Sequence, residues 1–302
     1  MPKTLVLYAY YHTPSTYTNM LFFMKNGIVP GVDYIMILNG DGWEPSIPLS
    51  GVSVVRRPNT GFDFGAYGSV LTPELVERYD YFVCMNASVI GPLWSSSDHP
   101  ADWTTVFTSM LSDDVALVGT SIVCLPESDA GGPGPRVEGF IWCTDRRGMR
   151  LLMASPCVFS EHRTKTDAIL RGEYEISKIM LSHGLNLGCL LGRYKGIDWR
   201  LPENHRMNGC IHPSRLGSYF GGTIDPYEVV FHKWRWHGLP NVLYDEVILP
   251  HIRATNREQY VGPTFDPSAY RSRYPDLAAL NDEQAREHFW TLGFLEGRTT
   301  LQ

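Results

Sequence analysis

The 302-residue sequence has no excess of basic residues and no long apolar run, and each absence excludes a class of protein. Its formal net charge is -6, so it lacks the broad basic surface that duplex nucleic acid requires. No apolar run approaches the roughly 20 residues that cross a bilayer. The N-terminus turns polar and aromatic too early for a secretory signal. We therefore expect a cytoplasmic protein without a transmembrane segment, which can still associate with a membrane peripherally.

Closely spaced metal-binding or nucleophile motifs are also missing. The six cysteines include no C-x-x-C pair, and several lie inside apolar runs such as YFVCMN, which favours reduced core thiols over structural zinc or disulfides. The ten histidines show no HExxH spacing, and neither a G-x-S-x-G motif nor a Walker phosphate loop occurs. Zinc hydrolase, serine hydrolase and P-loop functions are therefore not expected.

What the sequence does contain is an alternation of β-rich runs and helical patterns. Strands are predicted at 4–11, 33–40, 52–58 and 79–86, then at 115–125, 137–145, 187–191 and 228–236, with helices between them. The Gly- and Pro-rich residues 126–136 are predicted to lack regular structure. This order predicts an α/β fold with a mostly parallel sheet flanked by helices.

From residue 263 the sequence becomes charged and helical, which indicates a second, small unit. We predict a main domain over residues 1–262 and a helical C-terminal module over residues 263–302. The main domain is the one expected to carry the chemistry.

Ligands of open α/β sheets bind beyond the carboxyl ends of the strands. The stretch RPNTGFDFGAYGSVL follows one strand end, and it places Asn59, Gly61 and Asp63 at the start of a helix. Glycines let a backbone approach a ligand closely, and helix N-termini attract negative charge. The Asp63 carboxylate can accept hydrogen bonds from a uracil N–H or from ribose hydroxyls, although the same residue can also be a simple helix cap.

The next strand ends in YDYFVCMNASVIGP, which contains an N-x-S element. Together the two motifs resemble those of GT-A-type glycosyltransferases, and among these the rhamnan-synthesis-type and related polysaccharide enzymes. The segments LVLYAYYHTPSTYTNMLFFMKNGI, GEYEISKIMLSHGLNLGCLL and DPYEVVFHKW also look like this group, so the resemblance covers most of residues 4–236.

The resemblance implies a GT-A-like, Rossmann-like fold and a transfer reaction. The implied donor is a UDP-, GDP- or TDP-sugar, and the implied acceptor is a glycan or glycolipid in polysaccharide or surface-glycan assembly, with inversion at the transferred sugar. The alternative is a non-catalytic nucleotide-sugar or carbohydrate-binding protein of the same fold. The C-terminal YPDL…EGR segment resembles a short module found beside bacterial glycosyltransferases, where it either packs or docks a partner.

By position, the resemblance implies that four residues contact the nucleoside, namely Tyr8, Tyr10, Asn39 and Asp63. An aromatic ring among them would be available to stack on the base. It places Asn59 and Gly61 in the same donor-binding stretch. Lys233 matches a strand-end lysine of the family, where it would neutralise the leaving diphosphate.

Asn86 and Ser88 occupy the place where most of these enzymes have the two carboxylates of a D-x-D motif. Divalent cations prefer anionic oxygen ligands, so an amide and a hydroxyl should bind metal weakly. We therefore expect any Mn²⁺ or Mg²⁺ to arrive with the nucleotide sugar, with His232 as a further ligand. The other outcome is metal-free catalysis by basic side chains.

An inverting transfer needs a general base beside the acceptor hydroxyl. Glu175 opens the helix EYEISKIMLSHG at the place where the family carries an acidic residue, and it is the first choice. Glu173 and Glu138 are the next candidates. The competing interpretation is that acidic residues in a first helical turn only complement the helix dipole.

Replacing Asp63 by alanine is expected to weaken donor binding while leaving the fold intact. The expected loss is about 1.5–3 kcal/mol, typical of a hydrogen bond to a charged group. The check is nucleotide-sugar affinity of the folded variant, and an unchanged affinity would return Asp63 to the role of a helix cap.

Overall fold

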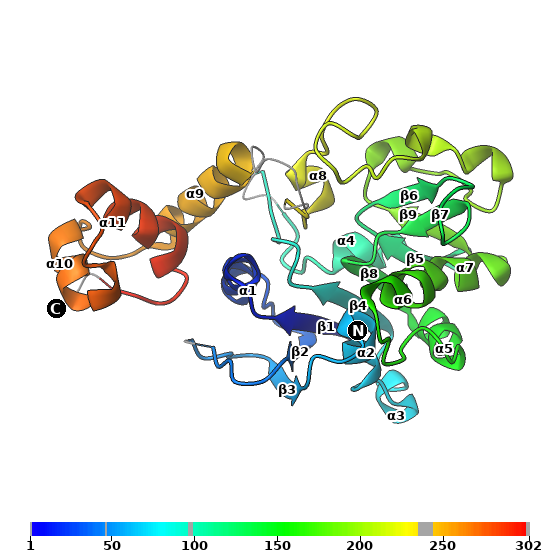
Figure 1. Ribbon diagram of the computed structural model, residues 1–302, viewed down its shortest axis with the longest axis horizontal. Helices are drawn as coiled ribbons and strands as arrows, with labels where there is room; N and C mark the ends of the chain where they lie inside the picture. The colour runs from blue at the N-terminus through cyan, green and yellow to red at the C-terminus, as the bar shows by residue number, and fades with distance from the viewer. Residues whose placement is uncertain (1, 46, 96–98, 235–243, 300–302) are drawn as a thin grey trace. The chain divides into compact units, whose positions relative to one another are not determined.

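The sheet carries the architecture that the alternating pattern predicts. The computed structural model describes residues 2–45, 47–95, 99–234 and 244–299. Its strands are β1 (Thr4–Tyr11), β2 (Val32–Asn39), β3 (Ser53–Arg57), β4 (Tyr81–Asn86), β5 (Val115–Gly119), β6 (Ile122–Leu125), β7 (Gly134–Val137), β8 (Ile141–Asp145) and β9 (Asn186–Cys189). Seven of them form one sheet in the order β3-β2-β1-β4-β8-β5-β9, and β6 pairs with β7 separately (Figure 1). Within the large sheet only β8 runs antiparallel to its neighbours, so the mostly parallel α/β fold is confirmed.

Helices connect and cover these strands. They are α1 (Pro14–Asn26), α2 (Phe62–Gly68), α3 (Pro73–Val76), α4 (Thr105–Thr108), α5 (Arg146–Ala154), α6 (Lys165–Asp167), α7 (Tyr174–Ser182), α8 (Pro226–Val229), α9 (Leu249–Gln259), α10 (Pro267–Arg273) and α11 (Asp282–His288). A π-helical segment, Ala168–Glu173, leads directly into α7. The described residues contain no helix that is both long and apolar enough to cross a membrane.

Both faces of the sheet are buried, as a parallel sheet requires. Successive side chains of a strand point to opposite faces. Leu5 and Leu7 of β1 therefore join the main core with α2 and α5, whereas Tyr8 stacks on Phe23 of α1 with ring centroids 4.9 Å apart. Apolar contacts on both faces of the sheet hold β1, and its last residues lie at the end of the sheet where ligands are expected to bind.

Two local predictions were wrong. Residues 126–136 were expected to lack regular structure, yet their last three residues belong to β7, where Pro135 lies opposite Cys124 of β6. Proline fits because a two-stranded sheet has free edges that need no N–H. In addition, the predicted strand 115–125 is two strands, β5 and β6, which belong to different sheets.

The predicted strand at 228–236 was also wrong over its described part. Asp225 caps a helical turn that starts with Pro226, because a proline at the first helical position has no N–H to satisfy. Val230 then turns the chain with a φ of 61°. Within residues 228–234, the β-type pairing is an isolated antiparallel bridge between Ile90 and His232. Residues 235–236 lie outside the described residues.

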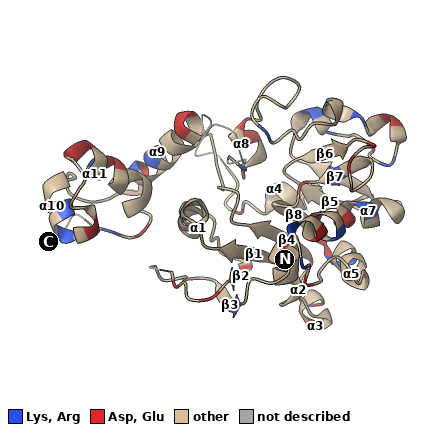
Figure 2. Ribbon diagram, in the orientation of Figure 1, with Lys and Arg blue, Asp and Glu red and all other residues tan. Residues whose placement is uncertain are grey.

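The chain divides into two compact units, residues 1–43 with 50–236, and residues 44–49 with 237–302. The second unit has an aromatic core of its own, built around Phe265, Tyr270 and Phe289. Asn256 of α9 is buried there and donates a hydrogen bond to the Trp290 carbonyl at 2.7 Å. Figure 2 shows acidic and basic segments interspersed along α9 to α11. The predicted domain boundary after residue 262 stays a prediction.

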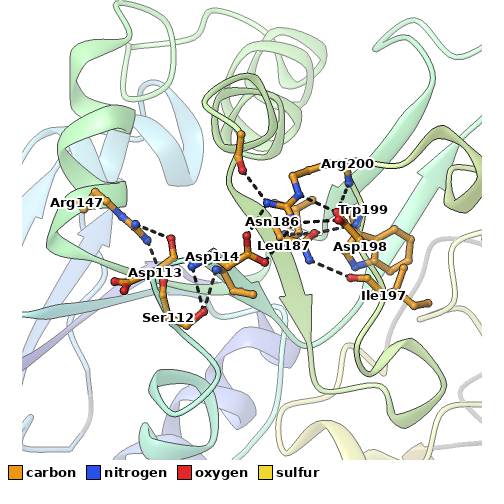
Figure 3. A network of polar contacts seen from close by, with 12 residues as sticks. Ser112, Asp113, Asp114, Arg147, Asn186, Leu187, Ile197, Asp198, Trp199 and Arg200 are labelled. Carbon is orange, nitrogen blue, oxygen red and sulfur yellow. Dashed lines mark hydrogen bonds and ion pairs between the residues drawn. The ribbon is translucent and has the colours of Figure 1, made fainter.

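A polar network holds the amino ends of β5 and β9 together, opposite the edge where ligands are expected (Figure 3). Asn186 is its centre. Its Nδ2 donates to the Ile197 carbonyl at 3.0 Å, and its Oδ1 accepts from the backbone N–H groups of Leu187 at 2.9 Å and Trp199 at 2.8 Å. These bonds fix the loop that places the Trp199 ring in the core.

Asn186→Ala is expected to lower the free energy of unfolding by roughly 2–4 kcal/mol, because buried backbone groups lose their partners. Arg200→Ala is the matched control from the same network. Arg200 makes exposed ion pairs with Asp114 and Asp198, which should be worth under about 1 kcal/mol. Urea unfolding of both variants measures the difference, and equal losses would contradict the role given to Asn186.

Candidate active site

The strand ends that the sequence singled out meet at one edge of the sheet. In the observed register Arg57 of β3 lies opposite Asn39 of β2, and Asn39 lies opposite Tyr11 of β1. Asn86 of β4 lies opposite Ala9 on the other side of β1. These strand ends therefore lie side by side at the carboxyl end of the parallel strands.

Asp63, Asn86 and Ser88 form one hydrogen-bonded chain at this edge. The Asn86 side-chain amide donates to Asp63 Oδ2 at 2.6 Å. Its Oδ1 accepts from both the backbone N–H of Ser88, at 2.9 Å, and the Ser88 hydroxyl, at 2.6 Å. Asp63 is not the cap of α2, because Gly61 holds that position and no side chain caps the helix there. The carboxylate is thus oriented by Asn86 and not by the helix start.

Lys233 interacts electrostatically with Asp63 and with two further carboxyl groups. Burial raises the pKa of Asp63, while the hydrogen bond from Asn86 and the charge of Lys233 act against the increase. Burial lowers the pKa of Lys233, and the charges of Glu173, Glu138 and Asp63 oppose that shift. The Lys233 ammonium also lies 5.4 Å from the centre of the Phe140 ring. Lys165 also acts on both Asp63 and Lys233, so the site combines two lysines with three acidic side chains.

The two predicted bases lie in different surroundings. Glu173 is half-buried, and its Oε1 accepts a hydrogen bond from the Gly139 N–H at 2.9 Å. Burial raises the pKa of Glu173, and the charge of Lys233 lowers it. Glu175, two residues further along, interacts electrostatically with Arg136 and Arg171. Glu173 thus interacts with Lys233, as Asp63 does, whereas Glu175 is not among the groups that act on Lys233 in the described part of the chain.

Glu138, the third acidic candidate, is fully engaged within the protein. Its side chain is buried and accepts hydrogen bonds from the hydroxyls of Ser121 and Ser214, the latter at 2.7 Å. His212 Nδ1 lies 3.1 Å from Oε1 of the same carboxylate. The arrangement joins residues 212–214 to the turn before β8, so Glu138 acts as an anchor for that loop.

Aromatic rings gather at the end of β1. The Tyr10 hydroxyl lies 2.9 Å from His12 Nδ1, and the Tyr10 ring lies 4.8 Å from that of Trp43. His12 stacks on Trp43 with centroids 4.6 Å apart and an interplanar angle of 17°. Tyr8 and Tyr10 are both buried, and Tyr8 packs in the core against Phe23. Sequence reasoning missed Trp43, whose only signal was its position shortly after the end of β2.

Asn39 has both ends of its side chain engaged. Its Nδ2 donates to the Tyr10 carbonyl at 3.3 Å, and its Oδ1 accepts from Arg57 at 2.8 Å. Arg57 also donates to the Thr60 hydroxyl at 3.0 Å. Asn59, by contrast, is exposed. Asn39 is therefore placed to hold the strand ends together, and Asn59 is open to solvent.

The glycines of the second motif meet the protein's own backbone. A Cβ at Gly61, where φ is 71°, would lie 2.7 Å from the Cα of Glu161, and one at Gly68 would lie 2.3 Å from the Phe159 carbonyl oxygen. Residues 159–161 thus pack directly on α2. The sequence pattern suggested that these glycines let the backbone approach a ligand, and the structure shows that they also let it approach residues 159–161.

The predicted metal ligands do not form a cage. Asn86 Oδ1 already accepts two hydrogen bonds from Ser88. His232 is buried, neither of its ring nitrogens has a hydrogen-bond partner in the described residues, and burial lowers its pKa to about 4. Across the described ranges no group of three or more His, Cys, Asp or Glu side chains could hold a metal ion. These residues by themselves do not fit a bound Mn²⁺ or Mg²⁺.

Comparison with known proteins finds similarity only among solved structures. No family model matches the chain, and no curated protein matches it. A mannosyltransferase from Pyrobaculum calidifontis, in complex with GDP-Man and Mn²⁺, is 13% identical with a TM-score of 0.38, and the match covers 97% of this chain and 85% of that one. Glucosyl-3-phosphoglycerate synthase from Mycobacterium tuberculosis, in complex with phosphoglyceric acid, is 16% identical with a TM-score of 0.33, covering 62% of this chain and 70% of that one.

The glycosyltransferase GlyE of Streptococcus pneumoniae is 13% identical with a TM-score of 0.33, and the match covers 62% of this chain and 45% of that one. Glycosyltransferases are thus among the structures that the chain is similar to. Identities and TM-scores this low establish no function, which has to be argued from the residues of the site.

Glu138 is expected to make the stability of the protein depend on acid pH. Burial raises the pKa of Glu138, but His212, Ser121 and Ser214 outweigh burial and lower it overall. A lowered folded-state pKa adds stability that is fully present above the unfolded value of about 4.3 and is lost as the pH falls below it.

Glu138→Gln should therefore lower the free energy of unfolding by about 2–4 kcal/mol at pH 7, with a smaller loss in acid. Denaturant unfolding from pH 7 down to the acid limit of folding measures this difference. Glu203→Gln, at an exposed position, is the control. A Glu138→Gln loss that does not change with pH would rule out the charged carboxylate as the source of the stability.

Proposed function

We propose that the chain is a glycosyltransferase of the GT-A-like class. It would move a sugar from a nucleotide-diphosphate donor to a glycan or glycolipid acceptor during polysaccharide or surface-glycan assembly. The observation that carries the proposal is the convergence of the Asp63–Asn86–Ser88 chain with Lys233 and Glu173 at the carboxyl ends of the strands. This is the edge where open α/β sheets bind nucleotides.

The proposed donor site uses the oriented carboxylate and the aromatic cluster. Asp63, held by Asn86, would accept hydrogen bonds from the ribose hydroxyls or the base. The exposed His12 and the half-buried Trp43 offer an aromatic surface for the nucleobase, and the buried Tyr10 holds this pair from within the protein. Aromatic faces favour such stacking. Tyr8 supports the cluster from within the core and would not touch the donor.

In the transfer step, Glu173 would accept the proton of the acceptor hydroxyl. The acceptor oxygen then forms a bond to the anomeric carbon of the donor sugar, and the bond from that carbon to the diphosphate oxygen breaks with inversion. Lys233 would stabilise the negative charge that develops on the departing diphosphate. A base whose pKa is raised by burial is better matched to neutral pH than an ordinary carboxylate.

Any Mn²⁺ or Mg²⁺ would arrive with the nucleotide sugar and be held mainly by its phosphates. The described residues supply too few anionic ligands for an ion held by protein alone, which hard cations need. Lys233 therefore carries the protein's share of charge neutralisation in this proposal.

The function is tested by nucleotide release from UDP-, GDP- and TDP-sugars by the purified protein, with donor binding followed by thermal shift. Glu173→Gln is expected to retain donor binding and to lower turnover by roughly two to four orders of magnitude. Glu175→Gln is the matched comparison and should keep most of the activity.

Loss of activity only in Glu175→Gln would move the base to Glu175, the residue preferred on sequence grounds. Binding of a nucleotide sugar without any turnover would favour the non-catalytic alternative. Neither binding nor turnover with any of the three donor classes would exclude the proposed function.

A further inference from the structure

A loop on the same unit as the proposed active site borders a hollow that is open to solvent. Residues 206–221 border an open space of about 580 Å³, here called the 206–221 hollow, which is lined by Met207, Ile211 and Phe220 together with Arg206 and with polar and glycine residues. Ile211 is 50% exposed and Phe220 is 41% exposed. Large apolar side chains left open around a concave surface indicate a binding site.

A single asparagine gives the hollow its shape. Asn208 Nδ2 donates to the carbonyls of Ile211 at 3.0 Å and Ser218 at 2.7 Å, and Asn208 Oδ1 accepts from the Phe220 N–H at 2.7 Å. These bonds join the two sides of the loop. The hollow is therefore shaped by contacts within the loop itself.

The loop also concentrates backbone strain. Asn208, Cys210 and Phe220 have φ values of 54°, 60° and 51°, a left-handed conformation that costs non-glycine residues free energy. Strain of this kind persists where the surrounding structure enforces it, and it gathers at ligand sites. At Phe220 it accompanies a ring that is exposed to solvent.

Neighbouring groups fix the ring of Phe220 in place. The Arg193 guanidinium carbon lies 4.7 Å from its centroid, and the Tyr219 ring lies 5.3 Å away. An aromatic side chain held by its neighbours loses little conformational freedom when a ligand stacks on it. Phe220 is thus prepared to offer a flat apolar surface.

The same loop is physically connected to the proposed base. Its residues His212 and Ser214 contact the Glu138 carboxylate. The following residue, Gly139, donates its N–H to Glu173. The position of the hollow is therefore coupled, through Glu138, to the side chain that would activate an acceptor hydroxyl.

We propose that the 206–221 hollow is a saccharide subsite that holds the acceptor, an assignment whose acceptor role rests on the proposed function. A pyranose ring would place its C–H face on Phe220. Ser218 and the backbone beside Gly209, Gly217 and Gly221 would bind its hydroxyls. The mixture of apolar and polar lining favours a sugar over a lipid chain, which would need an unbroken apolar surface.

Saturation-transfer NMR with the methyl glycosides of glucose, galactose, mannose, rhamnose and N-acetylglucosamine tests the site without needing activity. At least one glycoside should receive saturation from the wild-type protein. Its affinity should fall about three- to tenfold in Phe220→Ala, as expected for loss of one stacked ring, and should be kept in Phe220→Tyr.

Leu201→Ala is the matched control, since Leu201 is 44% exposed and does not line the hollow. It should bind the glycosides as the wild type does, and melting temperatures confirm that every variant is folded. Binding by none of the five glycosides, or equal binding by Phe220→Ala and wild type, would overturn the proposal.

Thermal shift with UDP-, GDP- and TDP-sugars, run in parallel, separates the two hypotheses. Glycoside binding that depends on Phe220 in a protein that neither binds nor turns over nucleotide sugars would leave a saccharide site and remove its acceptor role. Nucleotide-sugar turnover without Phe220-dependent glycoside binding would keep the proposed function and reject the hollow as the subsite.

Discussion

The free energy needed to remove carboxylates from water governs the arrangement of this site, where three acidic side chains lie partly or fully buried near the carboxyl ends of the strands. A charge taken out of water is tolerated only when it is paired or hydrogen-bonded. Each of the three acidic groups has such a compensation: Asp63 has the Asn86 amide, Glu173 has the Gly139 N–H, and Glu138 has two hydroxyls and His212. Lys233 interacts with all three. The loops around the edge are therefore held by the same contacts that hold the acidic groups.

Much of the main sheet could be predicted from the sequence, because each strand is encoded by a short run of neighbouring residues. Apolar runs such as residues 4–11 and 79–86 can be recognised from neighbouring residues alone, and they form β1 and β4. In the observed register the carboxyl ends of these parallel strands bring Asn39, Arg57 and Asn86 to the same end of the sheet. Two of the failures, at β7 and at residues 228–234, fall where proline is tolerated at an edge or starts a helical turn.

The detail of the site could not be predicted, because its contacts join distant parts of the chain. Glu138 and His212 are 74 residues apart, and no spacing rule connects them. The choice between Glu173 and Glu175 depends on which one points toward Gly139, a matter of helix rotation that a π-helical segment changes. Trp43 lies in an irregular stretch with no motif around it, so its stacking with His12 depends on a loop path that periodicity does not describe.

The packing of residues 159–161 against the glycines of α2 constrains how this protein can vary over evolution. No side chain can be added at Gly61 or Gly68 unless the facing backbone withdraws, and withdrawal would shift α2, which carries Asp63. Substitutions on the two segments are therefore expected to occur as compensating pairs. Residues 155–164 form the loop between α5 and α6. Insertions there should be rarer than in other surface loops.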